Sequence, residues 1–206
     1  MGSSWASRFQ AGVAVFLAAW SVAAAAQGGV VETAARPDAN DARDGRPFAI
    51  VDKRLATLSV YDAEGRLVGR TPALLGLTPG DQEPASARGK APDALNRQER
   101  VTPAGRFEAQ PGRNLSGERI VWIDYEANLA IHRLRPAPAS QRRPERLASS
   151  NLDERRITLG CVVVDPAFFD QVVLPTLGGS KSLVYILPER EPLLAAAPGS
   201  ARAAKL

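Results

Sequence analysis

The sequence is poor in the side chains that form disulfides, bind metals or stack on nucleic acid bases. Its 206 residues include one cysteine, one histidine and one methionine, and aromatic residues make up 6%. One cysteine cannot close a disulfide within its own chain, so Cys161 is a free thiol unless it pairs with another chain. With His132 as the only histidine, a metal site would need carboxylates, and no spaced cluster supplies them. We therefore expect neither a metal nor a cofactor.

Lysine is scarce as well, and arginine supplies most of the positive charge. The 26 basic residues exceed the 22 acidic ones and give a net charge of +4; the lysines are Lys53, Lys90, Lys181 and Lys205. A mildly basic protein suits an anionic wall or membrane surface. The basic residues are scattered and do not form a stripe with interleaved aromatics, which argues against a nucleic acid partner.

Only one long apolar run is present, and it lies close to the N-terminus. Within residues 1–26, Arg8 precedes the apolar run 11–19, and the small residues Ala24 and Ala26 follow it. This order is typical of a secretory signal peptide. The run is shorter than the roughly 20 residues of a membrane span, which favours cleavage over a retained anchor. We expect an exported protein of the periplasm or cell envelope, without a stable membrane span after cleavage.

The rest of the chain predicts one folded domain between two irregular segments. Residues 27–46 are mostly Ala, Asp, Arg and Gly, and this low apolar content predicts a flexible linker. Residues 189–206 are rich in Ala and Pro and predict a disordered tail. Residues 47–188 remain for a single domain with a sizeable core.

Alternating and β-branched runs predict that this domain is mainly β. We expect strands at 48–51, 56–61, 67–68, 105–109, 120–123, 128–132, 161–164 and 183–187. The turn at 62–65 predicts a hairpin. Residues 78–100 and 133–156 predict irregular loops. One short amphipathic helix is expected after Asp165 as N-cap and Pro166 at the first helical position, ending before Pro175.

The single histidine and the single cysteine lie at ends of predicted strands. His132 ends one strand and Cys161 opens the next, so the two can meet at one edge of a sheet. If they meet, the imidazole can take the thiol proton and Cys161 can attack a carbonyl as thiolate. The alternative is that Cys161 is a small buried hydrophobe and His132 a satisfied polar residue.

Four segments together resemble one enzyme family. In order, they are 51–53 leading into 58–62, then Thr102-Pro103-Ala104-Gly105-Arg106-Phe107, then Ala130-Ile131-His132, and Thr158-Leu159-Gly160-Cys161-Val162. The second segment matches a Thr-Pro-x-Gly-x-Phe turn before a strand, and the last two contain the only His and Cys. The chain thus resembles the catalytic domain of the L,D-transpeptidases, the YkuD-type peptidoglycan enzymes, from about residue 48 to residue 187.

The resemblance implies a β-sandwich with one or two short helices, and acyl transfer through a thioester without a cofactor. It makes Cys161 the nucleophile toward a peptidoglycan tetrapeptide stem and His132 the general acid and base. It assigns the backbone carbonyl of Arg133 to orienting the imidazole, and N–H groups around Gly160 and Cys161 to stabilising an oxyanion. Thr158 occupies a motif position suited to substrate binding, although hydroxyls in turns commonly serve local backbone bonds.

Three positions depart from the family pattern. Leu159 stands where the motif has a second histidine, Val163 where Arg or Asn is common, and Arg133 where glycine follows the upstream histidine. Apolar surroundings raise a thiol pKa. Two other functions therefore stay open, a catalytically degenerate relative that binds peptidoglycan and a wall-peptide hydrolase with the same chemistry. The arginines within 133–156 either bind carboxylates of peptide stems or form a solvated basic loop.

Overall fold

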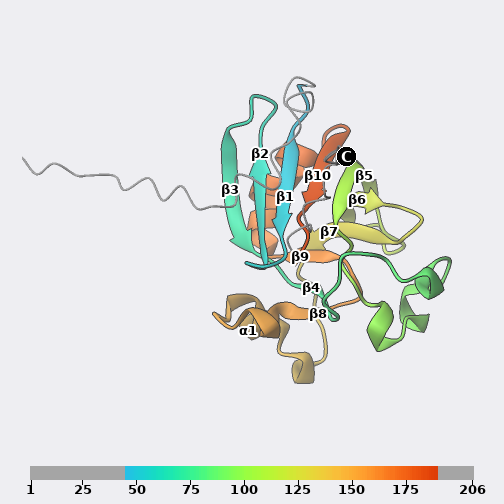
Figure 1. Ribbon diagram of the computed structural model, residues 1–206. Coiled ribbons are helices and arrows are strands. Elements are labelled where there is room, and N and C mark those ends of the chain that lie inside the picture. The colour runs from blue at the N-terminus through green and yellow to red at the C-terminus, as the bar shows by residue number, and fades with distance from the viewer. Residues whose placement is uncertain (1–44, 190–206) are drawn as a thin grey trace, which may run out of the picture. The chain divides into compact units, whose positions relative to one another are not determined.

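The structure, a computed structural model, describes residues 45–189 (Figure 1). The predicted signal peptide, nearly all of the predicted linker and all but the first residue of the predicted tail lie outside these residues. Within residues 45–189, no helix combines the length and the apolar composition that crossing a membrane requires.

The described strands form one large mixed sheet and one small one. The large sheet has eight strands in the order β3-β2-β1-β10-β5-β6-β7-β9, and β4 pairs with β8 in the small sheet. β10 lies parallel to β1, and β9 lies parallel to β7, whereas the other neighbours in the large sheet are antiparallel. The strands are β1 (Phe48–Asp52), β2 (Thr57–Tyr61), β3 (Leu67–Pro72), β4 (Leu75–Gly76), β5 (Gly105–Arg113), β6 (Arg119–Asp124), β7 (Leu129–Arg133), β8 (Arg156–Thr158), β9 (Val162–Val164) and β10 (Ser182–Ile186).

Strand β5 belongs to both halves of the large sheet. Its first part, 105–109, pairs with β10, and its second part, 110–113, pairs with β6. Side chains of both halves meet in one core, which includes Val51, Leu58, Val60, Val121, Ile131, Val162, Val184 and Ile186. Burial of each such side chain contributes about 1.5–3 kcal/mol. The predicted mainly β, sandwich-like fold with short helices is confirmed.

A helix of three segments, 166–177, packs on this core (Figure 1). As predicted, Asp165 caps it: Oδ1 accepts hydrogen bonds from the N–H groups of Ala167 at 2.8 Å and Phe168 at 3.1 Å. Phe169 and Val173 are fully buried in the core. The segments are α2 (Pro166–Phe168), the π-helical η7 (Phe169–Val173) and α3 (Leu174–Leu177).

The prediction that this helix ends before Pro175 is wrong. The chain continues as α3 to Leu177, and Pro175 lies in its first turn. A proline inside an α-helix removes one backbone hydrogen bond and clashes with the preceding turn. Here the wider π turn comes directly before it, so Pro175 starts a new helical segment instead of interrupting an old one.

The expectation that residues 133–156 are irregular is wrong in part. They contain the helix α1 (Arg143–Ala148) between two 3₁₀ turns, η5 (Ala139–Gln141) and η6 (Leu152–Arg155). Pro144 lies at the start of α1, where its missing N–H costs nothing. The only large apolar side chain of α1 is Leu147, which is buried against Leu74 and Val163. The polar composition of residues 133–156 did not indicate this helix, because Leu147 alone supplies its large apolar contact with the rest of the domain.

Most other strand predictions agree with the structure within one or two residues. β5 extends four residues beyond the predicted end at 109, and Cys161 lies just before β9 instead of opening it. The short strands β4 and β8 were not predicted. Residues 78–100 hold no strand, as expected, but three 3₁₀ turns, namely η2 (Ala85–Ala87), η3 (Pro92–Ala94) and η4 (Arg97–Glu99).

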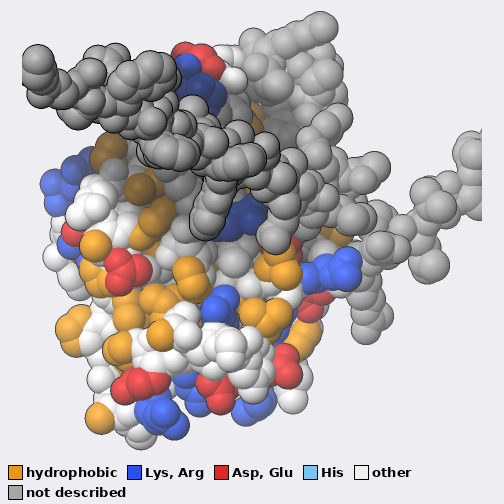
Figure 2. All heavy atoms as spheres, turned by 90° about the vertical axis from the view of Figure 1, so that its left-hand side faces the viewer, with side chains coloured by type: hydrophobic (Ala, Val, Ile, Leu, Met, Phe, Trp, Pro, Cys, Tyr) orange, Lys and Arg blue, Asp and Glu red, His pale blue; other side chains and the backbone are white. Residues whose placement is uncertain are grey.

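The edge of the large sheet at β3 carries exposed apolar residues. Leu67 is 54% and Val68 45% exposed. Figure 2 shows that hydrophobic side chains on this face of the molecule are interspersed with arginine, lysine and carboxylate side chains. Arg66 and Arg70 flank the two residues in the sequence. Charged side chains of this kind hinder edge-to-edge pairing with another sheet.

Candidate active site

The parallel pairing of β7 with β9 brings the histidine and the cysteine to one face of the sheet. His132 is opposite Val163, and Ile131 is opposite Val162. Continuing this register by one residue puts Cys161 beside Ala130. Because side chains alternate along a strand, His132 and Cys161 share the face opposite Ile131, on strands about 4.8 Å apart. Both residues line one cavity of about 490 Å³.

His132 is held by the carbonyl that the sequence singled out. Its Nδ1 lies 2.8 Å from the backbone oxygen of Arg133. A carbonyl oxygen only accepts hydrogen bonds, so Nδ1 carries the hydrogen and Nε2 is left as the basic nitrogen. The side chain is 9% exposed. Burial, aided by the positive charge of Arg135, lowers the pKa of His132 to about 4. The imidazole is therefore neutral at pH 7 and able to accept a proton.

The thiol of Cys161 is half-buried and hydrogen-bonded to the neighbouring turn. Its Sγ lies 3.3 Å from the carbonyl oxygen of Asn128, to which the thiol donates. Burial raises the pKa of Cys161, and the backbone N–H of Ala130 and the charge of Arg135 oppose this rise only in part. Within the described residues, no hydrogen bond joins this thiol to the imidazole. The resting pair is a neutral thiol and a neutral imidazole, not a thiolate and an imidazolium.

The backbone turn that carries Cys161 is shaped by Gly160 and two threonines. Gly160 has a φ of +142°, and a Cβ there would lie 2.9 Å from the carbonyl oxygen of Val101. Thr158 Oγ1 donates to the carbonyl of Cys161 at 2.7 Å and accepts from the N–H of Gly160 at 3.2 Å. Thr102 Oγ1 donates to the carbonyl of Gly160 at 2.7 Å. These contacts fix the turn directly before the sulfur.

The contacts of Thr158 and Gly160 bear on the roles expected of them. The Thr158 hydroxyl serves the turn, which is the local use that a turn hydroxyl commonly has. The N–H of Gly160, expected to face an oxyanion, donates to Thr158 in this structure. The substrate-binding role of Thr158 and the oxyanion role of Gly160 stay predictions. The backbone N–H groups of Ala130 and Cys161 partly oppose the rise of the thiol pKa, as donors to the sulfur would.

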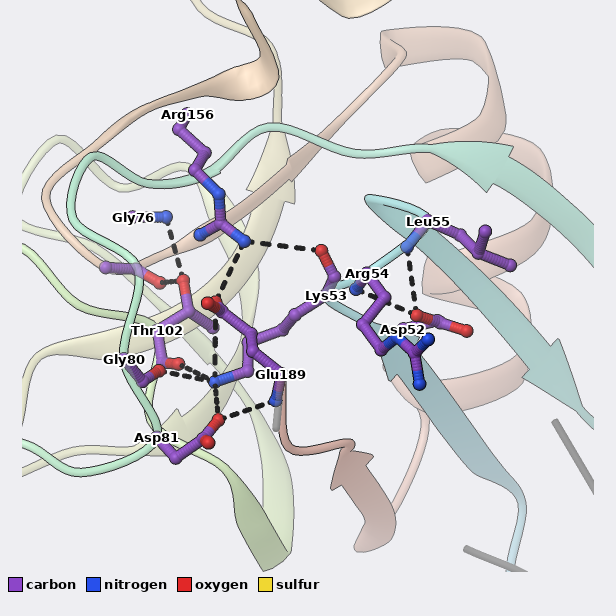
Figure 3. Close-up of polar contacts among 11 residues, drawn as sticks. Asp52, Lys53, Arg54, Leu55, Gly76, Gly80, Asp81, Thr102, Arg156 and Glu189 are labelled. Carbon is purple, nitrogen blue, oxygen red and sulfur yellow. Dashed lines mark hydrogen bonds and ion pairs between the residues drawn. The ribbon is translucent and has the colours of Figure 1, made fainter. Parts of the chain in front are cut away.

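A buried lysine supports this turn from behind (Figure 3). Lys53 Nζ is fully buried and donates to the carbonyl of Thr102 at 2.9 Å, to that of Gly80 at 2.5 Å and to Asp81 Oδ1 at 2.7 Å. Glu189 adds a carboxylate oxygen 3.7 Å from Nζ. Thr102 therefore connects the lysine to the turn. Its hydroxyl donates to the carbonyl of Gly160, and its own carbonyl accepts from Lys53.

Glu189, the last residue that the structure describes, is hydrogen-bonded to the residues around Lys53. Its N–H donates to Asp81 Oδ1 at 2.8 Å, and its carboxylate accepts from Arg156 Nη2 at 2.8 Å (Figure 3). The sequence had assigned Glu189 to a disordered tail, but it is tied to the domain by these bonds. The local sequence does not indicate this role, because the partners Asp81 and Arg156 lie far away along the chain.

Asn128 is a residue of the site that the sequence did not single out, whereas Arg135 and Arg143 belong to the arginines for which it left carboxylate binding and a solvated loop open. Asn128 gives the thiol its acceptor and has a left-handed φ of 52°, which asparagine tolerates better than most residues. Arg135 and Arg143 line the cavity with Cys161 and His132. The sequence predicts Asn128 as the first residue of the strand 128–132, whereas the structure has it in the turn before β7. Within residues 45–189, no three His, Cys, Asp or Glu side chains gather as metal ligands would.

No family model and no curated protein matches the sequence. The structure resembles solved L,D-transpeptidase structures. An L,D-transpeptidase from Mycobacterium smegmatis is 14% identical, with 69% of this chain and 58% of that one covered and a TM-score of 0.40. This chain therefore spans less than two thirds of that enzyme.

Two further structures give the same picture. The catalytic domain of the Enterococcus faecium L,D-transpeptidase is 17% identical, with 69% of this chain and 98% of that domain covered and a TM-score of 0.40. The helical cell shape determining protein of Campylobacter jejuni is 17% identical, with 70% of this chain and 48% of that one covered and a TM-score of 0.45. The likeness to all three structures is found at low sequence identity.

The departures from the family motif have structural explanations. Val163 is buried against Leu147 of α1 and Leu74, so this position packs the inserted helix. Leu159 lines the cavity and makes the surroundings of the thiol more apolar. The side chain of Arg133 pairs with Asp170 at 2.9 Å. Apolar packing around the thiol agrees with the raised pKa of Cys161.

The protonation of the resting pair predicts how Cys161 reacts with iodoacetamide. Because burial raises the thiol pKa, the thiolate fraction and the alkylation rate should climb about tenfold per pH unit from pH 6 to 8. The rate at pH 7 should be lower than for free cysteine. Intact mass measured over time reports this site alone, since the chain has one cysteine. A rate that is already constant between pH 5 and 7 would mean a preformed thiolate–imidazolium pair.

Proposed function

We propose that the protein is an exported cysteine acyltransferase that resembles the L,D-transpeptidases. It forms a thioester at Cys161 with a peptidoglycan tetrapeptide stem and passes the acyl group to an amine. The observation that carries this proposal is the hydrogen bond from His132 Nδ1 to the carbonyl of Arg133 at 2.8 Å. It leaves Nε2 of a neutral imidazole as a base in the cavity that His132 shares with the thiol.

In the first half of the reaction the thiol proton moves to His132 Nε2, and the sulfur attacks the carbonyl carbon of the donor peptide bond. A tetrahedral intermediate forms, and backbone N–H groups beside the sulfur stabilise its oxyanion. The C–N bond then breaks, and the imidazolium returns its proton to the departing amine of D-alanine. The products are a thioester on Cys161, free D-alanine and a neutral imidazole.

In the second half an acceptor amine attacks the thioester carbonyl while His132 takes a proton from it. The C–S bond breaks, the proton passes to sulfur, and the thiol and the neutral imidazole are restored. Water in place of the amine yields a free carboxylate and makes the protein a carboxypeptidase. No cofactor takes part in this scheme. Because the resting thiol is neutral, proton transfer to His132 has to generate the nucleophile during attack.

A peptidoglycan substrate implies an envelope location. Residues 1–26 have the composition of a secretory signal peptide and supply the route. Peptide stems are then the partner of the cavity, and the mild positive charge of the chain suits an anionic wall.

Mass spectrometry of the full-length protein tests this function. The purified chain is incubated with a tetrapeptide donor or a carbapenem, in parallel with Cys161→Ala. We expect an adduct on the wild type, equal in mass to the donor acyl group or the opened carbapenem, and none on the variant. No adduct on the folded wild type would contradict the proposal, and an adduct on the variant would remove Cys161 from the mechanism. Muropeptide analysis then separates cross-linking from hydrolysis.

A second function is favoured by the apolar packing of Val163 and the raised pKa of Cys161. It is a degenerate relative that binds peptide stems without acylation. Such a protein would bind a tetrapeptide and give no adduct at any pH between 6 and 9.

A further inference from the structure

Two arginines lie in the cavity beside the thiol and the imidazole. Arg135 and Arg143 line it together with Cys161 and His132. We propose that these two guanidinium groups bind the terminal carboxylate of the donor peptide and so select for it. This inference rests on the proposed acyl transfer and names the specificity of the same site.

The packing of α1 explains how Arg143 reaches the cavity. Leu147 of α1 is buried against Val163, which is two residues after Cys161 on the same strand face. The helix therefore lies against the wall of the cavity, and its first residue, Arg143, lines it. Arg143 Nε donates to Gln141 Oε1 at 2.6 Å, which fixes the plane of the guanidinium group.

The local charges leave one positive charge without a carboxylate. Arg135 pairs with Glu118 at 2.5 Å, and Arg133 pairs with Asp170 at 2.9 Å and with Glu118 at 3.4 Å. Among the residues that the structure describes, Arg143 forms no ion pair. Three guanidinium groups thus face two carboxylates. Burial, and then repulsion from Arg135, lower the pKa of Arg143, and a bound anion would relieve both effects.

Of the other carboxylates in the lining, Glu83 and Glu99 have cations of their own, whereas Glu126 forms no ion pair among the residues that the structure describes. Glu99 pairs with Lys90 at 2.6 Å, and Glu83 pairs with Arg88 at 3.4 Å. The hydrogen bond from Lys90 is the largest cause that lowers the pKa of Glu99, to about 2. This carboxylate is therefore charged at pH 7, and the ammonium group of Lys90 neutralises it. An incoming anion is therefore directed toward the arginines.

The covalent structure of the leaving residue limits the distance between the attacked carbonyl carbon and the terminal carboxylate. In a donor that ends one residue after the attacked bond, three covalent bonds of about 1.3–1.5 Å join the attacked carbon to the terminal carboxylate carbon. That carboxylate therefore lies within about 4.5 Å of the attacked carbon. Arg135 and Arg143 line the same cavity as Cys161 and His132, so a carboxylate at this distance from the attacked carbon lies in the cavity that both cations line. Arginine can bind such a carboxylate through two N–H groups.

Binding measured without turnover tests the proposal. The full chain carrying Cys161→Ala is titrated by calorimetry with a tetrapeptide acid and with the same peptide as its C-terminal carboxamide. We expect the acid to bind about tenfold or more tightly than the amide. Adding Arg143→Gln should weaken acid binding by about the same factor and leave amide binding unchanged. Arg143→Lys should recover part of the loss, because it keeps the charge but not the two-point geometry.

Arg142→Gln is the matched control, since it removes the same charge from an exposed neighbour outside the cavity lining. It should leave both affinities unchanged. Equal losses for acid and amide in Arg143→Gln, or no loss for either, would overturn the carboxylate site. If the acid-over-amide preference persists but the wild type forms no acyl adduct, the proposed transfer fails and the carboxylate site stands.

Discussion

Replacing His132 by glutamine is expected to slow acylation of Cys161 on the order of 10²–10⁴-fold at pH 7. Glutamine keeps a polar side chain of similar length but has no basic nitrogen, so the thiol proton has no acceptor. The raised pKa of the thiol makes this loss large, because few molecules hold a spontaneous thiolate. Stopped-flow or quenched mass spectrometry with a carbapenem measures the rate.

Two controls separate loss of the base from loss of the fold. The thermal midpoint of His132→Gln should stay above the assay temperature, and iodoacetamide should still alkylate Cys161 at pH 9, where a thiolate forms without a base. Added imidazole should restore part of the acylation rate if the cavity admits it. A loss of acylation below about tenfold would show that another group takes the proton.

Replacing Lys53 by methionine is expected to lower the free energy of unfolding by about 3–5 kcal/mol. Methionine fills similar space but leaves the carboxylates of Asp81 and Glu189, and two carbonyl groups, without the Nζ donor. Small domains are stable by only about 5–15 kcal/mol, so this change takes a large share. Urea unfolding of both proteins, followed by tryptophan fluorescence, gives the difference.

Lys181→Met is the matched control for this change. Lys181 is exposed, so removing its charge should alter the free energy of unfolding by less than about 0.5 kcal/mol. A loss below about 1 kcal/mol in Lys53→Met would mean that water replaces the lysine at low cost. If Lys53→Met also slows carbapenem acylation at temperatures where it remains folded, the contact with Thr102 transmits the loss to the turn before Cys161.

The sequence predicted the arrangement of the site better than its surroundings. The placement of His132 at the end of one strand and of Cys161 at the start of another depends on local alternation, which strands impose directly. Their meeting depends on the parallel pairing of β7 with β9, which no local pattern encodes. The family resemblance implied roles for both residues but no strand pairing, and the carbonyl of Arg133 lies within hydrogen-bond distance of the imidazole, as the resemblance implied.

The errors arose where distant contacts override local composition. Helix α1 was hidden because a single leucine, Leu147, supplies its apolar contact, and its partners Leu74 and Val163 come from other strands. The helix beyond Pro175 was missed because a π turn accommodates the proline. The buried contacts of Lys53 were not predicted, since its partners lie 27 and more positions away along the chain.

Thr102 occupies a place in the fold that constrains how this sequence can change over time. Its carbonyl accepts from Lys53, and its hydroxyl bonds both Gly76 and Gly160. A substitution at any of these positions changes both the contacts of Lys53 and the turn before Cys161. Such positions change in concert or not at all, so relatives that lose the lysine are expected to have rebuilt the threonine turn as well.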